Sequence, residues 1–101
     1  MEKNVRILQL SESKESRYYL FASLELLEKC GLKVNFDLYE SVYEFKMDFQ
    51  SESVDDDLES LYIKFQGRKP EGYTGHSLSV SDIIEVDGEK YYVDSFGFVK
   101  M

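Results

Sequence analysis

The sequence predicts an α+β domain in which a small, mostly antiparallel sheet of four to five strands packs against two helices, in the order β-α-β-α-β-β-β. Three observations support this prediction: a strictly alternating run in the middle of the chain, helical spacing of apolar residues on both sides of it, and an Asp-Gly turn between β-rich runs near the C-terminus. At 101 residues, 43% of them apolar and 15% aromatic, the chain can bury one core but not two. We therefore expect a single domain over residues 1–101.

The N-terminal segment is expected to form a strand and then a helix. The apolar-rich run of residues 5–10 predicts the first strand, and the Ser/Glu/Lys cluster of residues 11–16 predicts a loop that leads into a helix cap. Over residues 17–30 leucines recur at helical spacing while Glu and Lys can face water, which predicts the first helix. Gly31 suits the left-handed position just past a helix end, so Leu32 can fold back onto the last turn in a Schellman motif.

The clearest predicted element is a strand over residues 39–50. Its side chains alternate between a mainly aromatic face and a mainly charged face, which is typical of a strand with one side packed and the other in water. The first face comprises Tyr39, Ser41, Tyr43, Phe45, Met47 and Phe49, and the second comprises Glu40, Val42, Glu44, Lys46, Asp48 and Gln50.

A second helix is predicted to follow this strand. Ser53 can act as its N-cap and Gly67 can end it. Its first turn contains Asp55, Asp56 and Asp57, its buried stripe is expected to comprise Val54, Leu58, Leu61, Tyr62 and Phe65, and the bases near its C-terminal end are Lys64, Arg68 and Lys69. Three adjacent carboxylates could indicate a divalent cation, but the helix dipole favours acids in a first turn and the EF-hand spacing is absent. No metal site is therefore predicted.

The C-terminal third predicts a β-hairpin and one further strand. Residues 76–86 and 89–93 flank Asp87-Gly88, the dipeptide preferred in a two-residue type I′ turn. The resulting register pairs Glu85 with Lys90, Ile84 with Tyr91 and Ile83 with Tyr92. After a bend at Asp94-Ser95, residues 96–100 can add the last strand.

The net charge of −8 is concentrated in one part of the sequence. Residues 37–59 contain nine acids and one base, whereas acids and bases balance in the remainder. A negative field repels nucleic acid and attracts basic surfaces, including the grooves in which nucleic-acid enzymes hold their substrates. Direct binding of nucleic acid is therefore disfavoured, and the alternative to a binding role is that the acids only confer solubility. The candidate partner-binding surface comprises Glu40, Glu44, Asp48, Asp55, Asp56, Asp57 and Glu59.

The evidence for a catalytic site is weak. A Ser/His/Asp arrangement can be drawn around His76 with Asp82 or Asp94, but no Gly-x-Ser-x-Gly elbow or other known nucleophile context is present. The sequence also lacks a Gly-rich phosphate loop and an HExxH motif, so neither a cofactor nor a catalytic residue is predicted. Cys30 is the single cysteine, and a small buried thiol at a helix end is its ordinary interpretation.

The expected location is the cytoplasm. A lone Cys30 allows no intrachain disulfide and no Cys-based zinc site, which suits a reducing compartment. No apolar run approaches the roughly 20 residues that a bilayer requires, and no signal sequence is apparent at the start.

Four segments resemble the YodL-like domain family. They are residues 75–84, residues 91–98, the Leu-x-x-x-Gly-Leu helix end at residues 27–32 and the Tyr-Glu-x-Val-Tyr-Glu strand at residues 39–44, so the resemblance covers nearly the whole chain. The shared positions are Gly75, His76, Ser79, Asp82, Asp94 and Gly97. Structural roles are expected for them, with Asp82 capping the start of the hairpin and Asp94-Ser95 making its exit turn.

The resemblance also implies a genomic setting. YodL-like domains occur in Firmicutes and on their phages, plasmids and conjugative elements, commonly beside antirestriction-type modules, so a stand-alone copy is expected to be an accessory protein of a mobile element. The family has no established enzymatic activity, so the resemblance implies no catalytic residues.

The leading hypothesis combines this setting with the localised acid. It describes a non-enzymatic anti-defence protein, of anti-CRISPR or antirestriction type, whose acidic surface occupies a basic nucleic-acid-binding site on a host nuclease in the manner of a DNA mimic. A second hypothesis is a non-inhibitory interaction module that uses the segment of residues 76–82 and the hairpin. A third is a small hydrolase with His76 as base and Asp82 or Asp94 as its partner.

Overall fold

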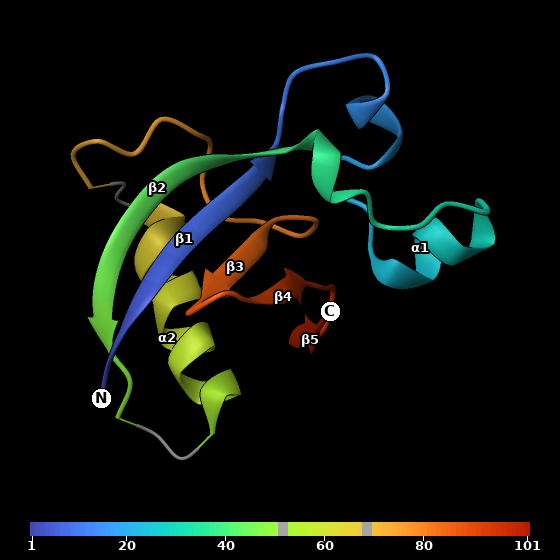
Figure 1. The fold of residues 1–101 in the computed structure, drawn as a ribbon. Coiled ribbons are helices and arrows are strands. Elements are labelled where there is room, and N and C mark those ends of the chain that lie inside the picture. Colours follow the sequence, from blue (N-terminus) through green and yellow to red (C-terminus); the bar gives the residue numbers. More distant parts are fainter. Residues whose placement is uncertain (51–52, 68–69) are drawn as a thin grey trace.

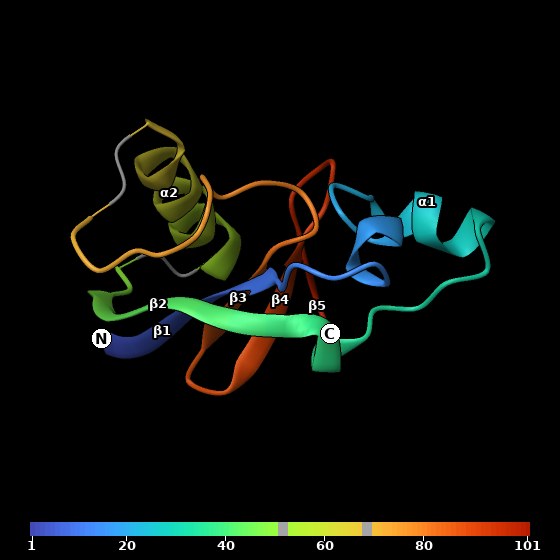
Figure 2. The ribbon, with the colours of Figure 1, turned by 90° about the horizontal axis from the view of Figure 1, so that it is seen from above.

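The computed structural model describes residues 1–50, 53–67 and 70–101, and it confirms the predicted α+β class (Figure 1). The described residues form one antiparallel sheet with the strand order β2-β1-β3-β4-β5, so β2 and β5 are its edges. The elements, with η for a 3-10 helix, are β1 (Glu2–Leu10), η1 (Ser16–Tyr18), α1 (Leu24–Lys29), η2 (Phe36–Leu38), β2 (Tyr39–Asp48), α2 (Val54–Gly67), β3 (Ile83–Val86), β4 (Glu89–Val93) and β5 (Phe98–Lys100). Figures 1 and 2 show that α1 and α2 lie at opposite ends of the molecule.

The predicted hairpin is confirmed in both turn and register. Asp87 and Gly88 have φ angles of 47° and 87°, as the two central positions of a type I′ turn require. The strand pairs are Ile83 with Tyr92, Ile84 with Tyr91 and Glu85 with Lys90. The last strand begins two residues later than predicted, because Asp94 N donates to Gly97 O at 3.1 Å and closes a turn there. This turn leaves the side chain of Phe96 94% exposed.

The single helix predicted over residues 17–30 is wrong in extent. The segment forms η1, then a break, and then the six-residue α1. Phe21 has a φ of 60°, which ends any helix there, and its N–H donates to Ser81 Oγ at 3.0 Å. Ser23 then caps α1 and accepts a hydrogen bond from Leu26 N at 3.1 Å. Leu20, which the leucine spacing placed in the buried stripe, is consequently exposed, and Cys30, interpreted as a buried thiol at the helix end, is exposed too.

The alternation predicted for residues 39–50 is interrupted at Val42. Ile7 pairs with Tyr43 but Leu8 pairs with Ser41, so Val42 is an extra residue in a β-bulge. Because a bulge reverses the sense of alternation, Val42 points into the core instead of lying on the charged face. For the same reason Tyr39 packs against the opposite side of the sheet from Tyr43.

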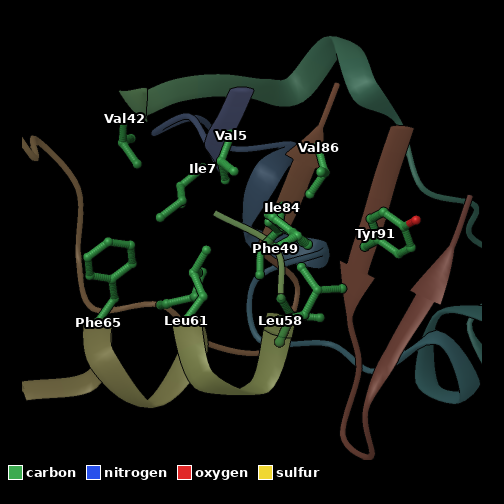
Figure 3. Close-up of a cluster of buried hydrophobic side chains, with 12 residues drawn as sticks. Val5, Ile7, Val42, Phe49, Leu58, Leu61, Phe65, Ile84, Val86 and Tyr91 are labelled. Atoms are coloured by element: carbon green, nitrogen blue, oxygen red, sulfur yellow. The ribbon is translucent and has the colours of Figure 1, made fainter. Parts of the chain in front are cut away.

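The larger core lies between the sheet and α2 (Figure 3). Three residues on one face of α2, Leu58, Leu61 and Phe65, are at most 3% exposed and point toward Val5 and Ile7 of β1. This stripe, the start of the helix directly after Ser53 and the aspartates of the first turn agree with the prediction. Of the predicted terminal bases, Lys64 lies in the last turn, whereas Arg68 and Lys69 lie outside the described residues, as does the acid Glu52.

A smaller core lies on the other face of the sheet and holds α1. Leu27 packs there with Leu8, Ile83 and Tyr92, which alternate along their strands with residues of the larger core. The predicted Schellman motif is confirmed, since Leu32 N donates to Leu27 O at 2.8 Å across a left-handed glycine.

Candidate functional site

The seven predicted acids divide into two groups, one on α2 and one on β2. The first group lies in the first turns of α2 and comprises Asp55, Asp56, Asp57 and Glu59. The second group lies on β2 and comprises Glu40, Glu44 and Asp48. All seven are exposed except Asp57, which is half-buried. The rings of Tyr43 and Phe45 contact that of Phe65 of α2 edge-on, with ring centroids 6.0 and 5.5 Å away. Glu44 and Asp48 alternate with these aromatic residues and therefore point to the other side of the sheet. Figure 1 shows that the end of β2 and the start of α2 nevertheless lie at the same end of the molecule.

Two of the three acids on β2, Glu44 and Asp48, lie close to positive groups. Asp48 Oδ1 accepts a hydrogen bond from the N-terminal ammonium at 2.7 Å, which holds the pKa of Asp48 below its usual value. Glu44 lies opposite Arg6, whose Nη2 is 2.7 Å from Glu85 Oε1. In the part of the chain that the structure describes, no ion pair is formed by Glu40, Asp55 or Glu59. Asp55 and Glu59 of α2 thus differ from Asp48 of β2, which pairs with the N-terminal ammonium.

A buried polar cluster around Gln9 is the feature that sequence reasoning missed. Gln9 is 2% exposed, and its Oε1 accepts from His76 N at 3.1 Å. Its Nε2 lies within hydrogen-bonding distance of His76 O at 2.8 Å, Asp82 Oδ2 at 3.0 Å and Tyr73 Oη at 3.2 Å. The side-chain amide of Gln9 thus connects β1 to residues 73–82 through hydrogen bonds. The position of Gln9 between two leucines was the available signal that its amide is buried, and a buried amide needs several partners.

Asp82 is the second centre of this cluster. Its Oδ2 also accepts from Ser79 N at 2.9 Å, and Asp82 N donates to Ser79 O at 3.1 Å, which forms a tight turn just before β3. The side chain is 1% exposed, and its Oδ1 has no hydrogen-bond partner among the described residues. Burial raises the pKa of Asp82 to about 7, although the bond from Ser79 and the nearby His76 oppose this shift. The fold therefore disfavours the ionised carboxylate.

The imidazole of His76 turns both nitrogens toward the protein. Nδ1 is 2.7 Å from Ser77 O, so this nitrogen carries the hydrogen, and Nε2 is 3.9 Å from Asp82 Oδ1. The ring contacts Phe21 edge-on and lines a hollow of about 270 Å³ with Leu10, Ser11, Glu12, Ser13, Ser16, Arg17 and Leu20. With its hydrogen on Nδ1, the imidazole has only Nε2 left to accept a proton, and at 3.9 Å from Asp82 Oδ1 this nitrogen is outside hydrogen-bonding distance of that carboxyl group.

The remaining shared positions make close backbone contacts. A Cβ added to Gly75 would lie 1.9 Å from Gln9 Oε1, so the chain passes too near the amide for any side chain. Asp94 Oδ1 accepts from Leu24 N at 3.1 Å, which joins the turn after β4 to the start of α1. Gly97 has a φ of 75°, a conformation that glycine adopts without strain.

The comparison with known proteins identifies the family. The sequence model of the YodL-like domain matches residues 4–101, which is nearly the whole chain. The chain belongs to the YodL-like domain family. No curated protein and no solved structure gives a match.

The two sets of predicted residues in this YodL-like domain lie apart. The six shared positions surround the loop of residues 75–82 and the turn after β4, whereas the acids lie on β2 and α2. Within the described ranges, no cluster of His, Cys, Asp and Glu side chains could hold a metal ion. Over the same ranges, no helix has the length and apolar character needed to cross a membrane.

Proposed function

We propose that this YodL-like domain is a non-enzymatic, cytoplasmic anti-defence protein of a mobile element, of the anti-CRISPR or antirestriction type. Its acidic surface occupies the basic nucleic-acid-binding site of a host nuclease. The observation that carries the proposal is the exposed acid at the start of α2, where Asp55, Asp56 and Glu59 lie on consecutive helical turns. Carboxylates held on a rigid element can take the place of phosphates in a positively charged groove.

The structure of α2 suits this role. Leu58, Leu61 and Phe65 fix the helix on the sheet, so the acids on its outer face are presented without a loss of backbone freedom on binding. Acids in the first turn are also favoured by the helix dipole, which means that their concentration there does not destabilise the fold.

The test is an affinity pulldown from a Firmicutes lysate that contains CRISPR and restriction nucleases, washed at low and at high salt. We expect a nuclease to be retained at low salt and released at high salt, because exposed charges are screened over about 8 Å at physiological ionic strength. The variant Asp55→Lys/Asp56→Lys/Glu59→Lys should lose this nuclease. The matched control, Glu12→Lys/Glu15→Lys/Glu71→Lys, makes the same change in net charge at exposed positions elsewhere and should keep it. Equal retention of the nuclease by both variants would refute the charge mechanism.

A non-inhibitory interaction module is the second candidate, and one observation favours it. An apolar groove of about 680 Å³ lies beside α1, lined mainly by Leu24, Leu27, Leu32, Phe36 and Met101. Recovery of a protein that is not a nuclease, and that high salt does not release, would favour this candidate. Residues 76–82, which the sequence assigned to such a role, are instead tied to the sheet through Gln9.

A further inference from the structure

β2 has an open edge whose backbone groups can be assigned. Met1 and Phe49 exchange two hydrogen bonds, from Phe49 N to Met1 O at 2.9 Å and from Met1 N to Phe49 O at 3.0 Å. Hydrogen-bonded and non-hydrogen-bonded pairs alternate along an antiparallel ladder. Counting back from Phe49, the N–H and C=O groups of Glu44, Lys46 and Asp48 therefore point away from β1.

The open part of this edge spans residues 44–48. On one side of it, Thr74 N donates to Val42 O at 3.1 Å, so a loop covers the edge there. Over residues 44–48, no other strand or loop of the described chain pairs with β2. A row of unpaired backbone groups of this kind is a template for another strand.

One face of the open edge carries a charge pattern. Glu44, Lys46 and Asp48 are exposed and alternate in sign, on the side of the sheet away from α2. A strand added antiparallel would place its residues directly opposite them, where opposite charges stabilise the pairing and like charges oppose it. Because Asp48 already binds the N-terminal ammonium, Glu44 and Lys46 contribute most of this selectivity.

The other face of the open edge is apolar and hollowed. A cavity of about 320 Å³ lies between β2 and α2 and is lined by Phe45, Lys46, Met47, Asp48, Ser60, Leu61, Lys64 and Phe65. In an added strand, the residues between the charged ones would point toward this cavity. Strand addition of this kind obtains affinity from main-chain hydrogen bonds and specificity from alternate side chains.

A second copy of the chain fits the edge poorly. Aligning two copies antiparallel over their full open edges would place Lys46 opposite Lys46 and Glu44 opposite Asp48, so every exposed pair would be of like charge. The pattern instead matches a foreign strand with basic, acidic and basic residues in alternation.

We propose that the β2 edge binds an extended segment of a protein partner as an added antiparallel strand. Basic, acidic and basic residues of the segment lie opposite Asp48, Lys46 and Glu44, and apolar residues between them enter the cavity beside α2. The inference rests on the proposed function only in taking the occupant to be a protein, and it uses a different surface from the α2 acids.

The test uses two labelled peptides and fluorescence anisotropy with the full chain. One peptide has the core Lys-Val-Glu-Val-Lys and the other the inverted core Glu-Val-Lys-Val-Glu, each flanked by threonines. We expect the first to bind about tenfold more tightly, because three favourable cross-strand pairs replace three unfavourable ones. The variant Glu44→Lys/Lys46→Glu/Asp48→Lys should reverse this preference, and N-methylation of the backbone amides that pair with β2 should abolish binding.

The proposal would be overturned by equal binding of both peptides, by no binding of either at millimolar concentration, or by a preference that the triple variant leaves unchanged. Concentration-dependent dimerisation that Lys46→Glu removes would assign the edge to a second copy, and would also overturn it. The α2 variant Asp55→Lys/Asp56→Lys/Glu59→Lys should keep the peptide preference. If the wild-type protein retained no nuclease but kept the peptide preference, the proposed function would fail while this inference would stand.

Discussion

The close approach of Gly75 to Gln9 predicts a large loss of stability from a single methyl group. In Gly75→Ala the new Cβ would lie 1.9 Å from Gln9 Oε1 and 3.0 Å from Val42 Cγ1. The Gln9 amide must then move, which breaks its bonds to His76 and Asp82. Leaving buried polar groups unpaired costs about 1–3 kcal/mol, and overpacking costs a similar amount. We expect the free energy of unfolding to fall by roughly 2–5 kcal/mol, a large part of the ~5–15 kcal/mol typical of a domain.

A double-mutant cycle measured by urea unfolding and far-UV circular dichroism tests the cause of this loss. In a Gln9→Ala background the amide is absent, so adding Gly75→Ala should cost less than about 1 kcal/mol further. Gly31→Ala is the control, because its φ of 72° makes alanine costly by about 1–2 kcal/mol while its Cβ meets nothing within 4 Å. That cost should be the same in both backgrounds. If Gly75→Ala were equally destabilising with and without Gln9, contact with the amide would not be the reason.

Further predictions concern the titrating and capping groups. Burial raises the pKa of Asp82 from 3.8 to about 7. Between these two pH values the folded state holds a proton on Asp82 that the unfolded state has lost. The contribution of this proton to the free energy of unfolding therefore falls as the pH rises from about 4 to 7. Asp82→Asn should remove this fall, which is at most roughly 4 kcal/mol, in urea titrations at several pH values. The hydrogen bond from Arg6 lowers the pKa of Glu85, so its stabilisation is lost as the pH falls below 4.5, and Glu85→Gln should reduce the acid sensitivity of the same titrations. Asp94→Ala should destabilise the protein by about 1 kcal/mol and speed amide exchange at Leu24, whose N–H it caps.

The elements that the sequence predicted correctly are those whose determinants are local. The Asp87-Gly88 turn sets the register of its hairpin through two adjacent φ angles, and Gly31 sets the end of α1 in the same way. The stripe of α2 repeats at helical spacing without interruption, so its buried face could be predicted residue by residue.

The errors arise where distant contacts override a local pattern. The leucine spacing of residues 17–30 continues through Phe21, whose non-helical conformation is held by Ser81, sixty residues further along the chain. Likewise the bulge at Val42 depends on pairing with β1, and the alternation shows only a single apolar residue on the otherwise polar face.

The candidate site was predictable only in part. The acids could be named from composition, but their division between two faces of the sheet depends on which side of β2 packs against α2. The shared His76 and Asp82 could be named from the family resemblance. Their common partner Gln9 belongs to a strand more than sixty residues earlier, so the sequence order gave no indication of the cluster.

The central claim is that the acids of α2 bind the nucleic-acid groove of a nuclease. The most direct measurement is DNA cleavage by the nuclease recovered in the pulldown, titrated with the wild-type protein and with separate reversals of the two acidic groups, Asp55→Lys/Asp56→Lys/Glu59→Lys on α2 and Glu44→Lys/Asp48→Lys on β2. We predict inhibition by the wild type that weakens with added salt and is lost with the α2 variant, because the exposed acids Asp55, Asp56 and Glu59 lie together at the start of that helix. Full inhibition by the α2 variant, or inhibition that salt does not change, would contradict the claim.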